Sequence, residues 1–210
     1  MIKILIADDH TMFREGLKRI IAEYPDLIVS DEARNGNEVI EKIFNNDFDI
    51  ILLDIAMPGL NGLEVLKQLK KEKPKMPVLI ITAHPEEQYA VRVMKAGASG
   101  YIMKESAPDE LIKAIRKISQ GRKYITSSLA EKLAFEIQED AQKPAHEILS
   151  DREYQVLLMI ASGKTVSQIG KELFLSVKTV SSYRTRILEK MKMKTNAELT
   201  HYVIKNNLLP

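Results

Sequence analysis

The chain has 210 residues, of which 45% are hydrophobic and 29% charged, as in an ordinary globular protein of one or two domains. It contains no cysteine, which excludes disulfides and thiolate metal sites, and no apolar run approaches the length of a membrane span. No apolar leader precedes the first predicted strand, so we expect a soluble, cytoplasmic protein that does not insert into a membrane.

The net charge of +2 hides an uneven distribution along the chain. Residues 148–210 carry ten Lys and Arg against five Asp and Glu, whereas residues 1–121 carry 17 against 19. A basic C-terminal part joined to a mildly acidic remainder favours a polyanion-binding module at the C-terminal end.

Short apolar runs alternate with amphipathic segments throughout residues 1–121. Thr11 is the expected cap of the first helix. Strands are predicted at residues 2–7, 27–29, 50–53, 78–81 and 101–103, and helices after Thr11 and at 37–44, 62–71, 86–95 and 108–119. Five strands alternating with five helices predict an α/β domain with a parallel, doubly wound, flavodoxin-like sheet.

The stretch 49–62, DIILLDIAMPGLNG, contains the most informative carboxylate. Residues 50–53 form a continuous apolar run, typical of a buried parallel strand, and Asp54 follows it directly. Taken alone, such an Asp more often begins a turn or caps the next helix. Right-handed crossovers, however, bring the carboxyl ends of all five strands to one edge of the sheet. That edge collects Asp8, Asp9, Asp54, Thr82 and Lys104.

This set of side chains has a consistent chemistry. Neighbouring carboxylates repel one another and normally need a cation to remain ionised together, and an all-oxygen set suits Mg²⁺. Thr82 offers a hydroxyl and Lys104 a point charge, which together could hold the oxygens of a phosphoryl group. Asp54 could then act as the nucleophile that forms an aspartyl phosphate.

Residues 1–121 resemble a two-component response-regulator receiver domain. The resemblance depends on the order Asp8-Asp9, Asp54 followed by MPGLNG, Thr82-Ala83 and Lys104. It implies that a sensor histidine kinase phosphorylates Asp54, and that Thr82 and Lys104 contact the phosphoryl oxygens. One departure is Glu105, where many receivers have proline.

The same resemblance implies a metal site and a switch residue. Asp9, Asp54 and the backbone carbonyl of Ala56 would bind Mg²⁺, with Asp8 assisting through water. Tyr101 would be the aromatic residue that turns inward on activation, although it could equally be an ordinary strand residue packed against a helix.

Residues 122–147 show a change of composition. A partly amphipathic linker helix is expected at 127–139, followed by a polar joint at 140–147 that contains Pro144. From residue 148 onward only helices are predicted. Ser150 and Glu153 form an S-x-x-E capping box, and later helices are expected at 166–173, from 176 or 177 to 191, and at 196–206. The short turn near residue 174 predicts a helix-turn-helix, whose second helix enters the major groove of DNA.

Residues 148–210 resemble the four-helix DNA-binding domain of the NarL/FixJ (LuxR-type) family. The matching segments are 149–153 (LSDRE), 163–164 (GK), 169–173 (IGKEL) and 176–183 (SVKTVSSY). By this resemblance the base-facing residues are Ser181, Ser182 and Thr185, and the candidate backbone contacts are Lys178, Thr179, Tyr183, Arg184 and Arg186. Hydroxyls and cations are the groups that contact phosphates and base edges. The last helix would join two copies on an inverted repeat, although its Leu199, Val203 and Ile204 could equally be core.

We therefore expect a phosphorylation-controlled transcription regulator with a receiver at 1–121, a linker at 122–147 and an all-α helix-turn-helix domain at 148–210. It would bind double-stranded promoter DNA as a homodimer, after release of the recognition helix or after dimerisation.

Three alternative functions fit the sequence less well. A phosphatase acting through an aspartyl phosphate usually has a second acid near its nucleophile, but Ala56 stands there and the connections are too short to enclose a substrate; we expect no enzyme. A receiver-like binding module that is never phosphorylated would not need all five residues of the edge. A dinucleotide-binding fold lacks its G-x-G-x-x-G after the first strand.

Overall fold

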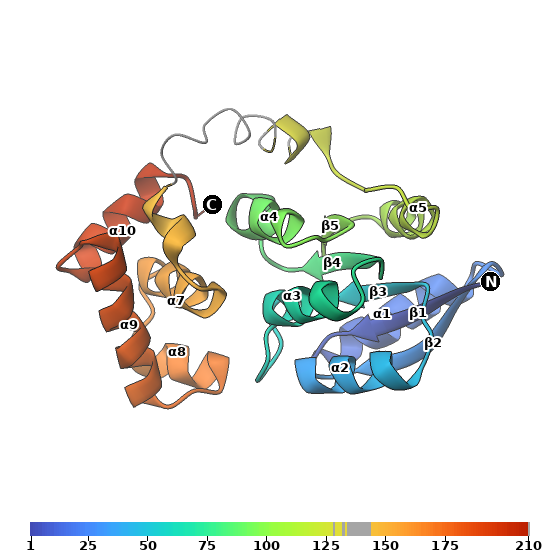
Figure 1. Ribbon diagram of the computed structural model, residues 1–210, viewed down its shortest axis with the longest axis horizontal. Helices are drawn as coiled ribbons and strands as arrows, with labels where there is room; N and C mark the ends of the chain where they lie inside the picture. The colour runs from blue at the N-terminus through green and yellow to red at the C-terminus, as the bar shows by residue number, and fades with distance from the viewer. Residues whose placement is uncertain (128, 132, 134–143, 210) are drawn as a thin grey trace. The chain divides into compact units, whose positions relative to one another are not determined.

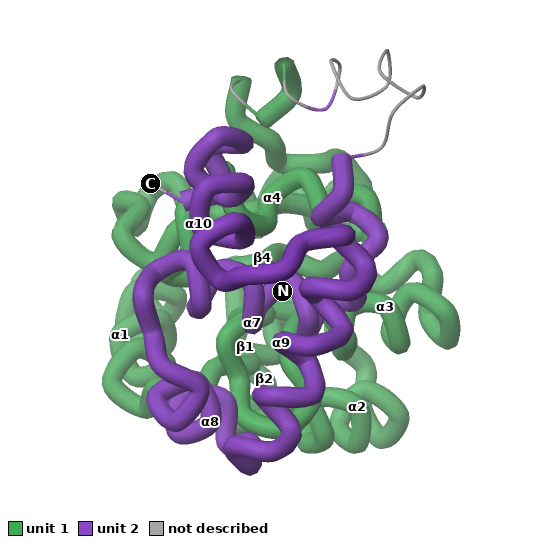
Figure 2. Tube along the Cα trace, turned by 90° about the vertical axis from the view of Figure 1, so that its left-hand side faces the viewer, with its two compact units in different colours: residues 1–131 green, residues 132–210 purple. Residues whose placement is uncertain are grey.

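The structure is a computed structural model that describes residues 1–127, 129–131, 133 and 144–209. The chain divides into two compact units, residues 1–131 and 132–210 (Figure 2). Among the described residues, no helix combines the length and the apolar character needed to cross a membrane.

Unit 1 contains a five-stranded sheet in the order β2-β1-β3-β4-β5, in which every neighbouring pair is parallel (Figure 1). The strands are β1 (Ile2–Ala7), β2 (Leu27–Ala33), β3 (Ile50–Leu53), β4 (Val78–Thr82) and β5 (Gly100–Met103). The predicted doubly wound α/β fold is thereby confirmed, and β3 carries the predicted bounds.

Helices cover both faces of this sheet. They are α1 (Thr11–Ala22), α2 (Gly36–Asn45), α3 (Gly62–Glu72), α4 (Glu86–Lys95) and α5 (Pro108–Ser119). Alternate strand residues such as Ile4, Ile50 and Leu79 form one core with the apolar faces of α1 and α5. Helices α2, α3 and α4 lie on the opposite face (Figure 1). Burial on both faces explains why β3 is apolar throughout and β4 is apolar up to Thr82.

Two local predictions for unit 1 were wrong. Strand β2 continues to Ala33 instead of ending at residue 29, because it is an edge strand whose polar residues find partners outside the sheet. Asp31 accepts a hydrogen bond from Lys42, and Glu32 is paired with Arg14 and Lys18. Thr11 does not cap α1, since the capping position is taken by His10, which makes no side-chain cap bond.

The segment after α5 packs back onto the rest of unit 1. Tyr124 donates its backbone N–H to Ser99 O at 2.8 Å, and Thr126 Oγ1 donates to the Glu86 carboxylate at 3.0 Å. Leu129 is fully buried. Residues 122–127 and 129–131, here called the strap, therefore contact the start of α4 and β5. Most of the linker helix predicted at 127–139 lies outside the described residues.

Unit 2 is helical in its described part. A 3-10 turn (Ala145–Ile148) precedes α7 (Asp151–Ala161), α8 (Val166–Leu173), α9 (Val177–Met191) and α10 (Asn196–Lys205). The predicted capping box is present, since Ser150 Oγ accepts from Glu153 N and Glu153 accepts from Ser150 N. On α10, Leu199 and Val203 belong to the core, whereas Ile204 is 61% exposed.

Candidate functional site

Asp54 leaves the sheet at the carboxyl end of β3 and is 2% exposed. The turn that follows folds back tightly, because Gly62 N donates to Ile55 O at 3.0 Å. A Cβ atom at Gly62 would lie 2.0 Å from the backbone oxygen of Asp54, so only glycine permits this approach. The start of α3 thus packs directly against the backbone of Asp54.

Lys104, one residue beyond β5, joins two of the predicted carboxylates. Its Nζ lies 2.8 Å from Asp54 Oδ2 and 2.6 Å from Asp8 Oδ2, and its side chain is only 14% exposed. The backbone holds it there, since Lys104 N donates to Thr82 O at 2.8 Å at the end of β4. Three strand ends that are distant in sequence therefore meet at one cation.

The electrostatics of this trio favour a charged lysine. Burial raises the pKa of Asp8, and the neighbouring Asp54 raises it further, against the opposing effects of Lys104 and the His10 N–H. Burial by itself would lower the pKa of Lys104, but the Asp54 and Asp8 carboxylates more than offset this effect and raise it. The ammonium group thus compensates carboxylates that would otherwise repel one another.

Asp9 and His10 complete an acidic cluster with Asp8 and Asp54, in which one ligand atom from each residue lies within 4.8 Å of the others. Asp9 Oδ1 is buried and accepts no hydrogen bond within the described part of the chain. His10 Nδ1 lies 2.8 Å from that oxygen, but not in hydrogen-bond geometry. A buried carboxylate oxygen that accepts no hydrogen bond, beside two further carboxylates, fits a hard divalent cation such as Mg²⁺.

The remaining predicted residues of unit 1 lie at the same edge. Thr82 is fully buried, and its Oγ1 accepts from His84 N at 3.4 Å. Tyr101 is 1% exposed, and its hydroxyl donates to His84 O at 2.6 Å. Burial strongly raises the pKa of Tyr101, which therefore remains a neutral donor. Ala56 contributes its N–H, which lies 3.3 Å from Asp54 Oδ1. Thr82 and Tyr101 are thus both bound to the loop that leads into α4.

Sequence reasoning missed two residues beside this edge. His10 donates its backbone N–H to Asp8 Oδ1 at 2.8 Å, and Arg14 binds the backbone oxygen of Asp8. A signal for Arg14 was present, because it shares the spacing i, i+3, i+7 with Leu17 and Ile21. An arginine on the apolar stripe of a helix needs buried partners.

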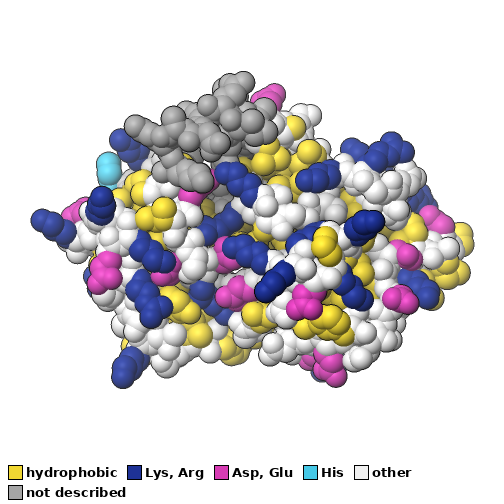
Figure 3. All heavy atoms as spheres, viewed as in Figure 1, with side chains coloured by type: hydrophobic (Ala, Val, Ile, Leu, Met, Phe, Trp, Pro, Cys, Tyr) yellow, Lys and Arg dark blue, Asp and Glu magenta, His cyan; other side chains and the backbone are white. Residues whose placement is uncertain are grey.

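The second candidate site is the exposed face of α9. Lys178, Ser181, Ser182, Thr185 and Arg186 are exposed, and Thr179, Tyr183 and Arg184 are half-buried. The core side of the helix consists of Val180, Ile187 and Met191, so the residues predicted to contact nucleic acid lie away from the core. In the space-filling view, Lys and Arg side chains protrude along the edge formed by α9 and α10 (Figure 3).

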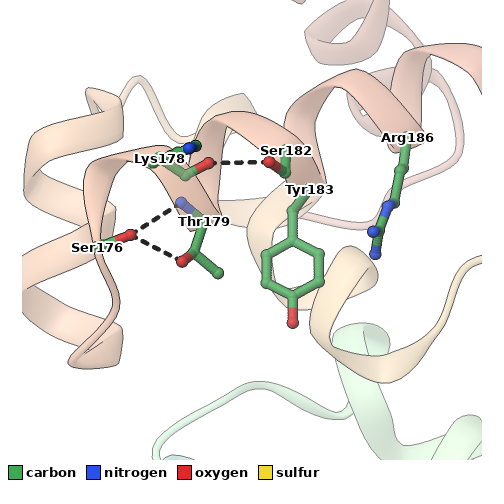
Figure 4. Close-up of a pocket in the computed structure, with 6 residues that line it drawn as sticks. All are labelled: Ser176, Lys178, Thr179, Ser182, Tyr183 and Arg186. Carbon is green, nitrogen blue, oxygen red and sulfur yellow. Dashed lines mark hydrogen bonds between the residues drawn. The ribbon is translucent and has the colours of Figure 1, made fainter.

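A hollow of about 310 Å³ lies on this face, lined by Ser176, Lys178, Thr179, Ser182, Tyr183 and Arg186 (Figure 4). Two hydroxyls along the helix are oriented by the backbone, because Ser182 Oγ donates to Lys178 O and Thr185 Oγ1 donates to Ser181 O. Arg184 differs from the other cations, since its Nε donates to Asn196 Oδ1 at 2.6 Å. This contact fixes Arg184 against the start of α10.

Comparisons with known proteins match the two parts of the chain to two different families. Residues 4–116 match the family described as response regulator receiver domain, and residues 147–203 match bacterial regulatory proteins of the luxR family. The chain is 36% identical over 209 residues to the response regulator UvrY of Escherichia coli, covering 99% of this chain and 96% of that protein. It is 35% identical over 210 residues to the response regulator GacA of Pseudomonas aeruginosa, covering 100% and 98%.

A solved structure of two RcsB dimers bound to two parallel DNAs also resembles the chain. It aligns with a TM-score of 0.60 at 25% identity and covers 97% of this chain and 98% of RcsB.

Proposed function

The chain belongs to the response regulators that join a receiver domain to a LuxR-type DNA-binding domain, and from this premise we propose that Asp54 is its phosphoacceptor and α9 its DNA-reading helix. Members of this family are DNA-binding transcription regulators. The observation that carries the proposal is the contact of Lys104 Nζ with Asp54 and Asp8, next to the unsatisfied oxygen of Asp9.

The donor is the phosphohistidine of a sensor histidine kinase. An oxygen of the Asp54 carboxylate attacks phosphorus, and the phosphorus–nitrogen bond of the donor breaks as the imidazole leaves. Lys104 and Thr82 then bind the phosphoryl oxygens, which require positive charge and donors in a buried site. Turnover of small phosphomonoesters is not part of this function, because the side chain two residues after Asp54 is that of Ala56 and supplies no second acid.

Mg²⁺ is the cofactor that these residues suit. Asp9, Asp54 and the backbone carbonyl of Ala56 would hold it, with Asp8 assisting through water. The ion would neutralise charge on the transferring phosphoryl group. The chain's own part is to bring three carboxylates to one strand edge, where Lys104 contacts two of them.

Phosphorylation changes the partners of Lys104 and Thr82. The added charge and oxygens draw both residues towards Asp54 and so shift the loop at His84, to which Tyr101 is also bound. The result is dimerisation, release of α9, or both, and exposed Ile204 on α10 offers an apolar contact for a second copy. RcsB dimers bind DNA, and we assign the same mode to this chain.

We propose that the functional divisions have the boundaries expected from the sequence. We assign the receiver to residues 1–121, the linker to 122–147 and the DNA-binding domain to 148–210. Lys178, Thr179, Tyr183, Arg184 and Arg186 would contact the DNA backbone, while Ser181, Ser182 and Thr185 would face the bases. A regulator that acts on promoter DNA works in the cytoplasm and needs no membrane contact.

The decisive experiment measures binding to inverted-repeat DNA by fluorescence anisotropy, with and without acetyl phosphate and Mg²⁺. Wild type is compared with Asp54→Ala and with the control Asp47→Ala, an exposed aspartate before the start of β3. We expect the phosphodonor to strengthen DNA binding in wild type and in the control, but not in Asp54→Ala. Equal binding by all three proteins, unchanged by the donor, would contradict the proposal.

A further inference from the structure

Arg14 on α1 is one of the few charged residues buried in unit 1. Its side chain is 3% exposed, and its guanidinium binds three separate segments of the chain. Nη1 donates to the backbone oxygen of Asp8 at 2.7 Å, Nε to Glu32 Oε2 at 3.0 Å, and Nη2 to Thr11 Oγ1 at 3.4 Å. Burying an arginine is costly unless its donors are satisfied, and the planar fork allows several bonds in fixed directions.

The bond to Asp8 O matters because of where that oxygen lies. Asp8 N donates to Ala33 O at 3.0 Å, so the backbone is held by β2 on the amide side of Asp8 and by Arg14 on the carbonyl side. The carbonyl belongs to the peptide unit that leads into Asp9. Fixing this unit fixes the position from which the Asp9 carboxylate projects. The Asp9 carboxylate oxygen Oδ1 accepts no hydrogen bond in the described part of the chain, and His10 Nδ1 lies 2.8 Å from it.

Glu32 anchors the other side of the guanidinium. It accepts from Arg14 Nε and also from Lys18 Nζ at 2.6 Å. The charge of Arg14 is therefore balanced at β2 and not by the acidic cluster, which leaves the Asp8 and Asp54 carboxylates to Lys104. This division allows Arg14 to orient the loop without competing for the ligands of a cation.

We infer that Arg14 is a positioning residue for the metal site: it holds the Asp8–Asp9 peptide so that the Asp9 carboxylate is pre-arranged to bind Mg²⁺. The inference rests on the proposed function, because it assumes that the acidic cluster binds the ion. Groups that orient metal ligands from outside the coordination shell commonly change metal affinity by about 10- to 100-fold when removed.

The test compares Mg²⁺ affinity by isothermal titration calorimetry in wild type, Arg14→Ala, Arg14→Lys and Lys18→Ala. Lys18→Ala is the matched control, because it removes a cation from the same Glu32 carboxylate without touching Asp8. We expect Arg14→Ala to weaken Mg²⁺ binding about tenfold. Arg14→Lys should weaken Mg²⁺ binding as well, because a single ammonium nitrogen cannot reach acceptors that Nε, Nη1 and Nη2 bind separately. Lys18→Ala should retain the wild-type affinity.

Two further measurements separate positioning from stability. Amide hydrogen exchange at Asp9 and His10 without Mg²⁺ should accelerate in the Arg14 variants and not in Lys18→Ala, while exchange in β3 stays unchanged. Should Arg14→Ala fail to fold, Arg14→Lys decides the question. Equal Mg²⁺ affinity in wild type and the folded Arg14 variants would overturn this inference alone. A wild type that binds no Mg²⁺ would overturn the proposed function and the inference with it.

Discussion

Lys104 is the residue on which the electrostatic balance of the acidic edge depends. Replacing it with Met removes the charge and the terminal nitrogen but keeps most of the unbranched side chain, and leaves the Asp8 and Asp54 carboxylates facing each other in a buried site. We expect a loss of about 2 kcal/mol in the free energy of unfolding, because removing the lysine leaves two buried carboxylates without a compensating charge.

The check is chemical denaturation with and without Mg²⁺. Mg²⁺ should restore more stability to Lys104→Met than to wild type, since the ion supplies the missing positive charge. An unfolding midpoint of Lys104→Met equal to that of wild type in the absence of Mg²⁺ would show that the carboxylates do not need the lysine.

A second charged pair, in unit 2, has a defined pH dependence. Glu153 Oε2 lies 2.6 Å from Lys190 Nζ. Burial tends to raise the pKa of Glu153, but the bonds from Lys190 and Ser150 hold it below its ordinary value of 4.5. A carboxyl whose pKa is lower in the folded state stabilises the fold above its unfolded pKa, and this contribution is lost as the pH falls through the folded pKa.

Glu153→Gln should therefore cost about 1–2 kcal/mol near neutral pH and progressively less as the pH drops below 4.5. Urea denaturation of both proteins at several pH values measures this difference. A constant difference at all pH values would mean that the charge of Glu153 contributes nothing.

Among the elements, the strap can pack against β5 only because residue 100 is glycine. The strap backbone pairs with β5 at Tyr124 and Gly100. A Cβ at Gly100 would lie 2.8 Å from Tyr124 O and 3.0 Å from Leu79 Cδ1 and Ile118 Cδ1. Gly100→Ala should destabilise unit 1 by about 1–3 kcal/mol, as overpacking of a rigid site does.

Gly16→Ala is the matched control in α1, where a Cβ would meet nothing within 4 Å. It should stabilise the helix by about 0.5–1 kcal/mol. Denaturation curves of the two variants should thus shift in opposite directions, and a shift in the same direction would refute the packing argument.

DNA binding through helix α9 should depend on the salt concentration. If Arg186 contacts a DNA phosphate, Arg186→Ala should weaken binding to all DNA sequences alike. It should also reduce the magnitude of the slope of log K against log salt concentration by about 0.9. Lys205→Ala, at the end of α10, removes the same charge away from α9 and should change the slope less. Anisotropy titrations at several salt concentrations measure both slopes, and an unchanged slope in Arg186→Ala would remove this residue from the interface.

For the whole molecule, each unit has its own core. Ile4, Ile50 and Leu79 are fully buried in unit 1, and Ile169 and Val180 in unit 2. We expect two thermal unfolding transitions, one for each unit. Mg²⁺ should raise the midpoint temperature of the unit 1 transition only, and cognate DNA that of the unit 2 transition only. Scanning calorimetry of the full chain tests this, and a single transition raised by either ligand would mean that the units unfold together.

The sequence alone determined which elements form and in what order, because apolar periodicity, caps and turn residues act within a few neighbours. β3, α4, α5 and α8 have the bounds predicted for them. It also predicted that Asp54, Thr82 and Lys104 would come to one edge, since parallel strands with right-handed crossovers share that geometry.

The contacts between those residues are defined only in the folded chain. The two contacts of Lys104, the unsatisfied oxygen of Asp9 and the full length of β2 depend on atoms far apart in the chain. Arg14 is the clearest case, because its partners come from the end of β1, the start of α1 and β2. A buried cation can be recognised in a sequence by its place on an apolar face, but the carbonyl that it binds is defined only when the chain is folded.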